Sequence, residues 1–177
     1  GVAIILELAS MFAKNPPPIG VNLVFFDGED SGDPGVNETY CQGSRYFAKN
    51  LPITAPAEGI ILDMVGDKQL VLPIERYSLE YHEVLVRQLW DRAREMNLDA
   101  FTGHVDYALY DDHVPLNEYA GIPTIDIIDF KYPNPYANFW HTLDDVPGNC
   151  SAESLEQVGR LMADYIYNRP ETTGDED

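Results

Sequence analysis

Acidic side chains and histidines stand at the ends of several apolar segments in this sequence. Segment 21–26 (VNLVFF) leads into two adjacent acids, and segment 59–65 (GIILDMV) carries an acid inside its apolar run. Carboxylates that are brought close together repel one another, and the repulsion costs free energy unless a cation or shared protons offset it. The usual offset is a divalent metal ion. The residues whose chemistry matters most are Glu29, Asp30, Asp63, Asp111, Asp112, His113, Trp140 and His141.

The types of these residues favour zinc over other metals. Carboxylate oxygens combined with one or two imidazoles suit zinc in an open catalytic site. Glu29 and Asp30 are neighbours in the loop 27–35, so one can bind the metal while the other stays free to take a proton. Zinc lowers the pKa of a water that it binds, and a nearby free carboxylate can then act as the base. Asp63 lies inside an apolar strand, where an unpartnered carboxylate is costly, so it needs a partner or a function.

The apolar pattern predicts the elements that must position these side chains. Apolar residues at helical spacing indicate helices, and short continuous apolar runs indicate buried strands. The expected helices span residues 1–14, 39–50, 77–97 and 151–167, and the expected strands span 21–26, 59–65 and 121–129. This alternation predicts a three-layer α/β fold with a central, largely parallel (mixed) sheet flanked by helices. Ligands bind at the carboxyl ends of the strands in such sheets, which is where the acids fall.

Finer expectations concern packing and the two cysteines. In the helix 77–97, one face is expected to carry Val84, Leu85, Leu89 and Ala93. Ser151 is a plausible cap for the last helix. Cys41 and Cys150 are too few and too far apart for a disulfide scaffold or a zinc knuckle. They either form one long-range disulfide or are two unrelated thiols.

The composition excludes two classes of partner. The chain of 177 residues has 11 Lys and Arg against 30 Asp and Glu, which gives a net charge of −19. This charge disfavours binding to the phosphate backbone of a nucleic acid, which requires basic patches, and docking on an anionic membrane. No apolar run reaches the roughly 18–20 residues of a membrane-spanning helix. We therefore expect neither a nucleic-acid partner nor membrane insertion.

Four motifs in a fixed order carry a resemblance to a known family. They are FFDGED at 25–30, ILDMVG at 61–66, DDHVPLNEYAGIPTID at 111–126 and FWHTLDD at 139–145. In this order they resemble the zinc-dependent exopeptidases of metallopeptidase family 28, and most of all their glutaminyl-cyclase-like branch. The resemblance covers residues 1 to about 167. It implies a zinc-exopeptidase-like fold, one or two zinc ions, and a peptide or small peptide-like substrate.

The resemblance also implies the roles of the metal residues. Glu29 matches the general base, and Asp30 matches a metal carboxylate for which the family usually has Glu. His141 matches the imidazole ligand of the retained zinc. Asp63 matches a ligand of the second zinc in two-metal aminopeptidases, and a proton-shuttling group in one-zinc cyclases. Trp140 matches a tryptophan that lines the cyclase pocket.

The remaining matches fall in the third motif. Asp111 matches an acid of the catalytic hydrogen-bond network of the cyclases. Asp112 and His113 belong to the same segment, and we expect them in the substrate pocket. Asp126 stands where animal cyclases carry a histidine, which counts against a full cyclase site.

The resemblance implies that part of the catalytic domain lies upstream of Gly1. The family has a strand and further metal ligands ahead of the first helix, so we expect residues 1–168 to form a single partial catalytic domain. Residues 169–177 (RPETTGDED) are expected to be a disordered acidic tail. The family also implies a secreted or periplasmic protein.

Three functions stay open from the sequence. The first is a zinc aminopeptidase in which Glu29 activates the water bound to the metal. The second is a glutaminyl-peptide cyclotransferase that forms N-terminal pyroglutamate with one zinc ion. The third is a binding domain that retains the fold without catalysis.

Overall fold

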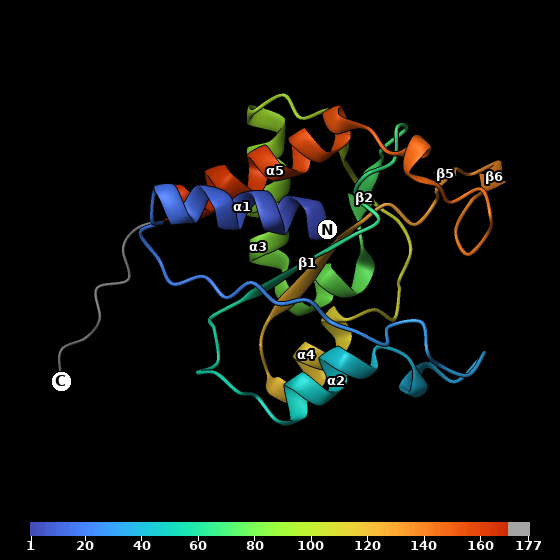
Figure 1. The fold of residues 1–177 in the computed structure, drawn as a ribbon, viewed down its shortest axis with the longest axis horizontal. Coiled ribbons are helices and arrows are strands. Elements are labelled where there is room, and N and C mark those ends of the chain that lie inside the picture. The colour runs from blue at the N-terminus through green and yellow to red at the C-terminus, as the bar shows by residue number, and fades with distance from the viewer. Residues whose placement is uncertain (170–177) are drawn as a thin grey trace.

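The computed structural model describes residues 1–169 (Figure 1). Most of the predicted acidic tail, residues 170–177, lies outside the described residues. Arg169 is described, and its Nη1 lies 3.2 Å from Glu58 Oε1. This ion pair holds the Arg169 side chain near the end of the last helix, and the boundary expected after residue 168 stays a prediction.

The four predicted helices are confirmed, with small changes at their ends. The described helices are α1 (Val2–Lys14), α2 (Gln42–Lys49), α3 (Arg76–Glu95), α4 (His113–Ala120) and α5 (Ala152–Tyr167), with 3-10 turns at Asn37–Thr39 and Pro147–Asn149. The strands are β1 (Gly59–Asp63), β2 (Leu72–Ile74), β3 (Phe101–Val105), β4 (Thr124–Ile128), β5 (Pro133–Asn134) and β6 (Ala137–Asn138). The sequence reasoning did not predict α4, β2 or β3, which are short or lack a clear apolar period.

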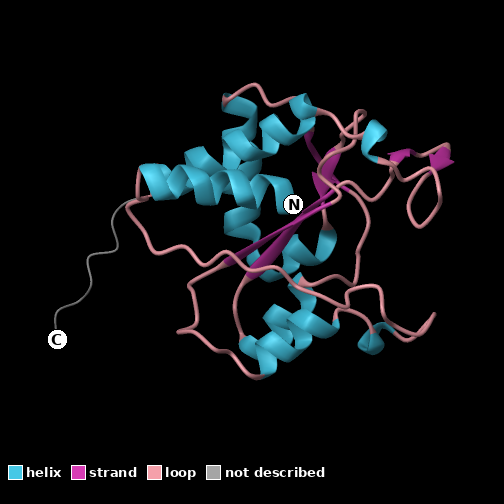
Figure 2. Ribbon diagram, viewed as in Figure 1, coloured by secondary structure: helices cyan, strands magenta, loops and turns pink. Residues whose placement is uncertain are grey.

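The strands confirm an α/β fold with parallel pairing (Figure 2). β1 pairs with β4 in parallel, with Ile61 opposite Asp126 and Asp63 opposite Ile128. β2 pairs with β3 in parallel, and the two-residue strands β5 and β6 are antiparallel. Every residue of β4 is buried. Within the described residues the strands therefore form separate two-stranded pairs in place of the one continuous sheet that the pattern predicted.

The predicted strand at 21–26 is wrong. This segment is irregular, and none of its backbone groups enters a ladder within residues 1–169. Its apolar character has another use, because Phe26 packs edge-to-face on Phe47 of α2 at a centroid distance of 5.4 Å. Phe25 remains 51% exposed. Apolar residues indicate burial, but a strand also needs a neighbouring backbone with which to pair.

The helices lie on both sides of the β1–β4 pair. Figure 1 shows α1 and α5 together above these strands and α2 with α4 below them, in agreement with the contacts between the paired helices. Ser151 caps α5, as predicted, by accepting a hydrogen bond from Ser154 N at 3.3 Å. The core includes Ile125 and Ile127 of β4 and Leu161 of α5, all with no exposed surface.

The face that α3 buries differs from the prediction at one position. Leu85, Leu89 and Ala93 are buried as expected, but Val84 is 73% exposed. The backbone at His82 is non-helical, with φ −149° and ψ 64°. The buried residues 85, 86, 89, 90 and 93 follow one regular helical period, and Val84 lies on the opposite side of the helix.

The two cysteines are separate thiols, so the disulfide alternative is wrong. Cys41 is buried at the start of α2, while Cys150 is exposed before α5. No helix among residues 1–169 is long and apolar enough to cross a lipid bilayer.

Candidate metal and catalytic site

The loop that carries Glu29 and Asp30 is fixed against the first turn of α2. Cys41 N donates to Glu29 O at 2.9 Å, Gln42 N to Gly28 O at 3.3 Å, and Gly43 N to Asp27 O at 2.9 Å. The first amides of a helix have no partner inside the helix, so they are free to bind this loop. These bonds run from α2 to successive residues of the loop and set the position of Glu29.

Gly43 permits the close approach of the loop. A Cβ at this position would lie 2.5 Å from Asp27 O and 2.7 Å from Asp27 N, which is too close for non-bonded atoms. A side chain at Gly43 would therefore push the loop, and Glu29 with it, away from α2.

Asp30 and His141 lie together although they are far apart in the sequence. His141 Nε2 is 3.1 Å from Asp30 Oδ1, and both side chains are about half-exposed. The Trp140 and His141 rings stack at a centroid distance of 3.9 Å and an interplanar angle of 19°. His141 has a φ of +57°, a left-handed conformation that is uncommon for residues other than glycine. The structure thus brings together two of the three predicted metal residues.

The register of β1 and β4 places two acids on the same face. Asp126 pairs with Ile61, and Asp63 lies two residues further along β1. Partners in a parallel register and residues two apart in a strand point to the same side, so Asp63 and Asp126 share that side. Asp126 has no exposed surface, and neither of its carboxyl oxygens has a hydrogen-bond partner within the described part of the chain.

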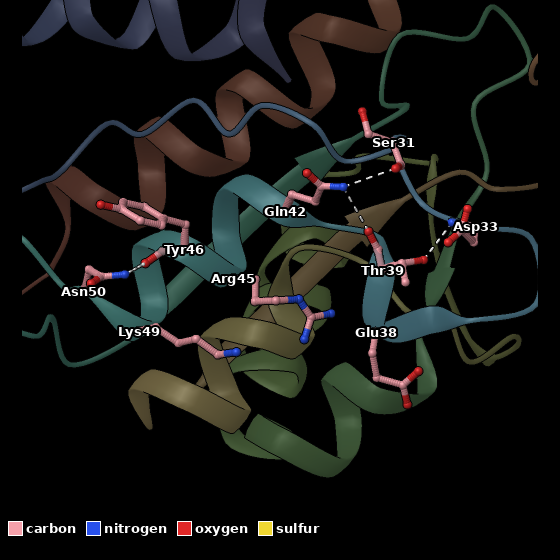
Figure 3. A pocket seen from close by; sticks show the side chains of 9 residues that line it. All are labelled: Ser31, Asp33, Glu38, Thr39, Gln42, Arg45, Tyr46, Lys49 and Asn50. Atoms are coloured by element: carbon pink, nitrogen blue, oxygen red, sulfur yellow. Dashed lines mark hydrogen bonds between the residues drawn. The ribbon is translucent and has the colours of Figure 1, made fainter.

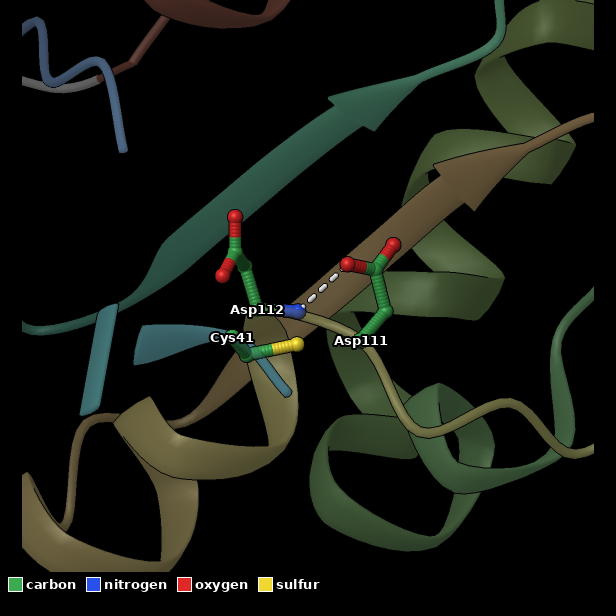
Figure 4. A group of neighbouring side chains, drawn as sticks. All are labelled: Cys41, Asp111 and Asp112. Atoms are coloured by element: carbon green, nitrogen blue, oxygen red, sulfur yellow. Dashed lines mark hydrogen bonds between the residues drawn. The ribbon is translucent and has the colours of Figure 1, made fainter. Parts of the chain in front are cut away.

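Asp111 and Asp112 complete an acidic cluster at the start of α4 (Figure 4). Asp111 Oδ1 accepts from Asp112 N at 2.6 Å, and its Oδ2 is buried without a partner among residues 1–169. Asp112 Oδ1 accepts from Ser44 Oγ at 2.5 Å. Single ligand atoms of Asp111, Asp112 and Cys41 all lie within 4.8 Å of one another, the one such trio that the described residues form. Asp30, Asp63 and His141 are more widely spread than this trio, and their sharing of one metal stays a prediction.

Burial and mutual repulsion raise the pKa of most acids in the cluster. Burial, and then the charge of Asp111, raise the pKa of Glu29 to about 8 and that of Asp63 to about 7. Burial also raises the pKa of Asp112 to about 6. The pKa of Asp126 lies well above its usual range, because of burial and then the charges of Asp111 and Asp63. The charge of Asp30 also raises the pKa of Glu29. Glu29 is therefore close enough to feel the charges of both the acidic cluster and Asp30, which pairs with His141.

These observations fit a bound cation. Several carboxylates are crowded and partly unpartnered, and an imidazole lies beside one further carboxylate. A divalent ion would offset the repulsion and supply partners for carboxylate oxygens. The donors are oxygen and nitrogen, which is a set that zinc accepts in catalytic sites.

The sequence predicted that Asp112 and His113 lie in the substrate pocket, but the structure buries both side chains. His113 has no exposed surface, and Asp112 is only 6% exposed. Both belong to the end of α4 that packs under the acidic cluster, so neither side chain is placed to contact a substrate at the surface. Trp140 is 37% exposed and is the one predicted pocket residue that is open to solvent.

A surface hollow lies elsewhere, on the outer side of α2 (Figure 3). Its volume is about 470 Å³, and its lining residues are Ser31, Asp33, Glu38, Thr39, Gln42, Arg45, Tyr46, Lys49 and Asn50. None of the predicted site residues lines it. The chemistry of the acidic cluster, and not the size of this hollow, therefore defines the candidate site.

Sequence reasoning gave Asp126 no role of its own and missed Glu75 and Cys41. Asp126 carries the same signal as Asp63, an acid inside an apolar strand (TIDII), so the pattern could have singled it out. Glu75 precedes α3 and shows no such signal. Cys41 joins the cluster only through the folding of α2 onto α4.

Comparisons with known proteins identify the family and the fold. The family model described as peptidase family M28 matches residues 1–166, so the chain belongs to peptidase family M28. A Zn-dependent exopeptidase from Parabacteroides distasonis is 32% identical with a TM-score of 0.88, and the match covers 95% of this chain and 61% of that chain. A glutaminyl cyclase from Bacteroides thetaiotaomicron is 31% identical with a TM-score of 0.89, covering 96% and 61%.

The curated relatives are longer than this chain. A glutaminyl-peptide cyclotransferase of Boiga dendrophila is 21% identical over 189 residues, covering 90% of this chain and 49% of the relative. The chain thus spans about half the length of the curated relatives that it matches. The predicted family, the α/β zinc-exopeptidase-like fold and membership of an enzyme family are confirmed.

Replacing Gly43 with alanine should destabilise the loop that carries Glu29. We expect Gly43→Ala to lower the free energy of unfolding by about 1–3 kcal/mol, the usual cost of overpacking. The matched control is Gly103→Ala in β3, where nothing lies within 4 Å of an added Cβ. Denaturant unfolding measures both variants. Equal stability of the two would show that the loop does not depend on the contact at Gly43.

The stability of the metal-free chain should rise as the pH falls from about 7.5 to about 5. Acids with a raised pKa hold their protons more tightly in the folded state, so stability is lost as the pH rises through the folded pKa values. Each proton of difference changes the free energy of unfolding by about 1.4 kcal/mol per pH unit. Below about pH 4 the trend should reverse, because the lowered pKa values of Glu75 and Asp164 act in the opposite sense.

Thermal unfolding in chelator at a series of pH values tests this trend. Asp126→Asn removes one of the groups and should make the slope shallower. A slope of the opposite sign between pH 5 and about 7.5 would contradict the crowding of carboxylates at this site.

Proposed function

We propose that this chain is the larger part of the catalytic unit of a zinc-dependent enzyme that acts on the N-terminal residue of peptides. The observation that carries the proposal is Glu29, a base whose pKa of about 8 keeps it ready to exchange protons near neutral pH. It adjoins the Asp30–His141 pair on one side and is acted on by the charges of the buried cluster. Membership of peptidase family M28 supports the same reading.

The residues that would hold zinc are Asp30, His141 and Asp63, with any further ligands supplied from outside this chain. One or two ions are compatible with this set, because Asp63 can ligate a second metal or act in proton transfer. The bound ion would supply Lewis-acid polarisation of a substrate carbonyl and a lower pKa for water. Stacking of Trp140 on His141 would hold the imidazole in orientation.

The reaction that we place first is aminopeptidase-type hydrolysis. Glu29 takes a proton from the attacking water and returns it to the amine that leaves when the peptide bond breaks. Burial, and then the charges of Asp111 and Asp63, raise the pKa of Glu29, which strengthens it as the base that takes the proton from the water.

A second reaction, cyclisation of an N-terminal glutamine, is favoured by Trp140. Its ring is partly exposed and adjoins Phe130 edge-to-face at a centroid distance of 5.2 Å, which places two aromatic rings next to His141. In this reaction the substrate's α-amine attacks its own side-chain amide and ammonia leaves. Glu29 takes the proton from the amine and gives it to the side-chain amide nitrogen as its C–N bond breaks and it leaves as ammonia, so the same base serves either chemistry.

We also propose that residues 1–168 need the upstream strand and metal ligands implied by the family to complete the site. The coverage of 61% of two related structures supports this. Secretion or export to the periplasm belongs to the same proposal and rests on the family resemblance alone.

Product analysis on the full-length protein separates the candidate functions. With zinc added, the protein is given an aminoacyl chromogenic substrate and a peptide that begins with glutamine. Release of a free amino acid identifies the peptidase, and release of ammonia without shortening of the peptide identifies the cyclase. Release of neither would leave only a binding domain.

Glu29→Gln should lower kcat by about 10²–10⁴-fold, the contribution of a general base, with little change in KM. The matched control is Glu38→Gln, which changes an acid in the 3-10 turn beyond the loop and should leave kcat unchanged. Equal rates for Glu29→Gln and the unmodified enzyme would overturn the role of Glu29.

A further inference from the structure

Three ionisable side chains with no exposed surface lie next to one another in the interior of the protein. They are Glu75, directly before α3, His113 at the start of α4, and Asp126 in β4. His113 Nε2 is 3.3 Å from Glu75 Oε2, and His113 Nδ1 is 4.0 Å from Asp126 Oδ2. The imidazole thus has one carboxyl group at each of its nitrogens. Neither hydrolysis nor cyclisation as described above uses these three side chains.

Glu75 is held as an anion by four donors. Its Oε1 accepts from Tyr77 N and Leu109 N, both at 3.0 Å, and its Oε2 accepts from Ser78 N at 2.6 Å and Ser78 Oγ at 2.8 Å. Burial alone would raise the pKa of Glu75, but His113 and these backbone amides outweigh it and lower the pKa. The N-terminus of α3 also favours a negative charge. Glu75 is therefore a fixed acceptor that cannot rotate away.

His113 is fixed in place by its neighbours but has no hydrogen bond as the ring now lies. Both ring nitrogens are buried without a partner among the residues described. The ring meets Tyr81 edge-on at a centroid distance of 6.2 Å, and its backbone begins α4. Nε2 already lies 3.3 Å from Glu75 Oε2, so reorientation of the ring would complete a hydrogen bond between them. Since the anion can only accept, the ring proton belongs on Nε2.

A proton on Nε2 leaves Nδ1 as an acceptor that faces Asp126. Asp126 N donates to Ser78 Oγ at 2.8 Å, which ties β4 to the first turn of α3 and so to Glu75. Both carboxyl oxygens of Asp126 lack partners within residues 1–169. A protonated Asp126 would donate to Nδ1 once the two groups close their present separation of 4.0 Å.

We propose that Glu75 and His113 form a buried positioning pair that fixes the Nε2–H tautomer of His113 and thereby orients Asp126 beneath Asp111 and the acidic cluster. The titratable groups that face His113 are Glu75 and Tyr81 from α3 and its cap, Asp126 from β4, and Asp112 beside it. The pair belongs to the fold and does not depend on which reaction the enzyme performs. The pair can influence Glu29 only through Asp126 and Asp111, and that influence matters for catalysis only if the proposed function is right.

Nitrogen-15 NMR of the histidine rings tests the pair on the folded, metal-free chain. The sequence has 4 histidines, so single substitutions of the others assign the His113 ring. We expect His113 to show the Nε2–H tautomer alone. A proton on Nδ1 alone, or on both nitrogens, would overturn the proposal. No substrate or metal is needed, so the result is independent of the proposed function.

Two substitutions of the partners sharpen the test. Glu75→Gln removes the anion and should abolish the single-tautomer signature, giving a mixture of both tautomers. Asp126→Asn donates an amide hydrogen as a protonated acid would, and should keep the Nε2–H form. The control Glu83→Gln changes an exposed acid of α3 that pairs with Arg87 and should leave the His113 signals unchanged. An unchanged tautomer in folded Glu75→Gln would contradict the pair, and if that variant does not fold, the unmodified protein decides alone.

Discussion

The crowding of carboxyl groups at the ends of β1 and β4 is the constraint on which this structure depends. Burial, and then the charge of Asp111, raise the pKa of Glu29, Asp63 and Asp126. A hydrophobic core alone gives no reason to bury such groups, since an unpartnered buried carboxylate is costly. The arrangement becomes favourable when protons are shared or a cation is bound. A cation bound beside a base with a raised pKa would supply metal-assisted proton transfer, which is the chemistry proposed for this site.

Different elements deliver each group to this place by ordinary backbone geometry. The parallel register of β1 and β4 puts Asp63 and Asp126 on one face, and the first amides of α2 hold the loop that carries Glu29. The loop that follows β6 brings His141 next to Asp30, although the two residues are far apart in the sequence. Only the fold makes neighbours of these residues, which explains why no single short motif defines the site.

The sequence predicted those parts of the structure whose signal is local. Helices with a clear apolar period were found, and Asp63 was recognised because an acid inside an apolar strand demands an explanation. Segment 21–26 was predicted wrongly, since apolar character reports burial and not the presence of a pairing partner. Val84 was misplaced because it points away from the helical stripe that Leu85, Leu89 and Ala93 share with Val86 and Trp90. The burial of His113 and the role of Glu75 depend on contacts between α3, α4 and β4, which have no counterpart in sequence spacing.

Zinc affinity measured by calorimetry on the full-length protein tests the central claim most directly. His141→Ala removes the imidazole next to Asp30, and the matched control His104→Ala removes an exposed imidazole in β3 beside Asp106. The account predicts that His141→Ala weakens zinc binding by more than about 100-fold, beyond the usual effect of losing an outer-shell partner, while the control binds normally. Equal zinc affinity in the two variants would contradict a metal centre at Asp30 and His141.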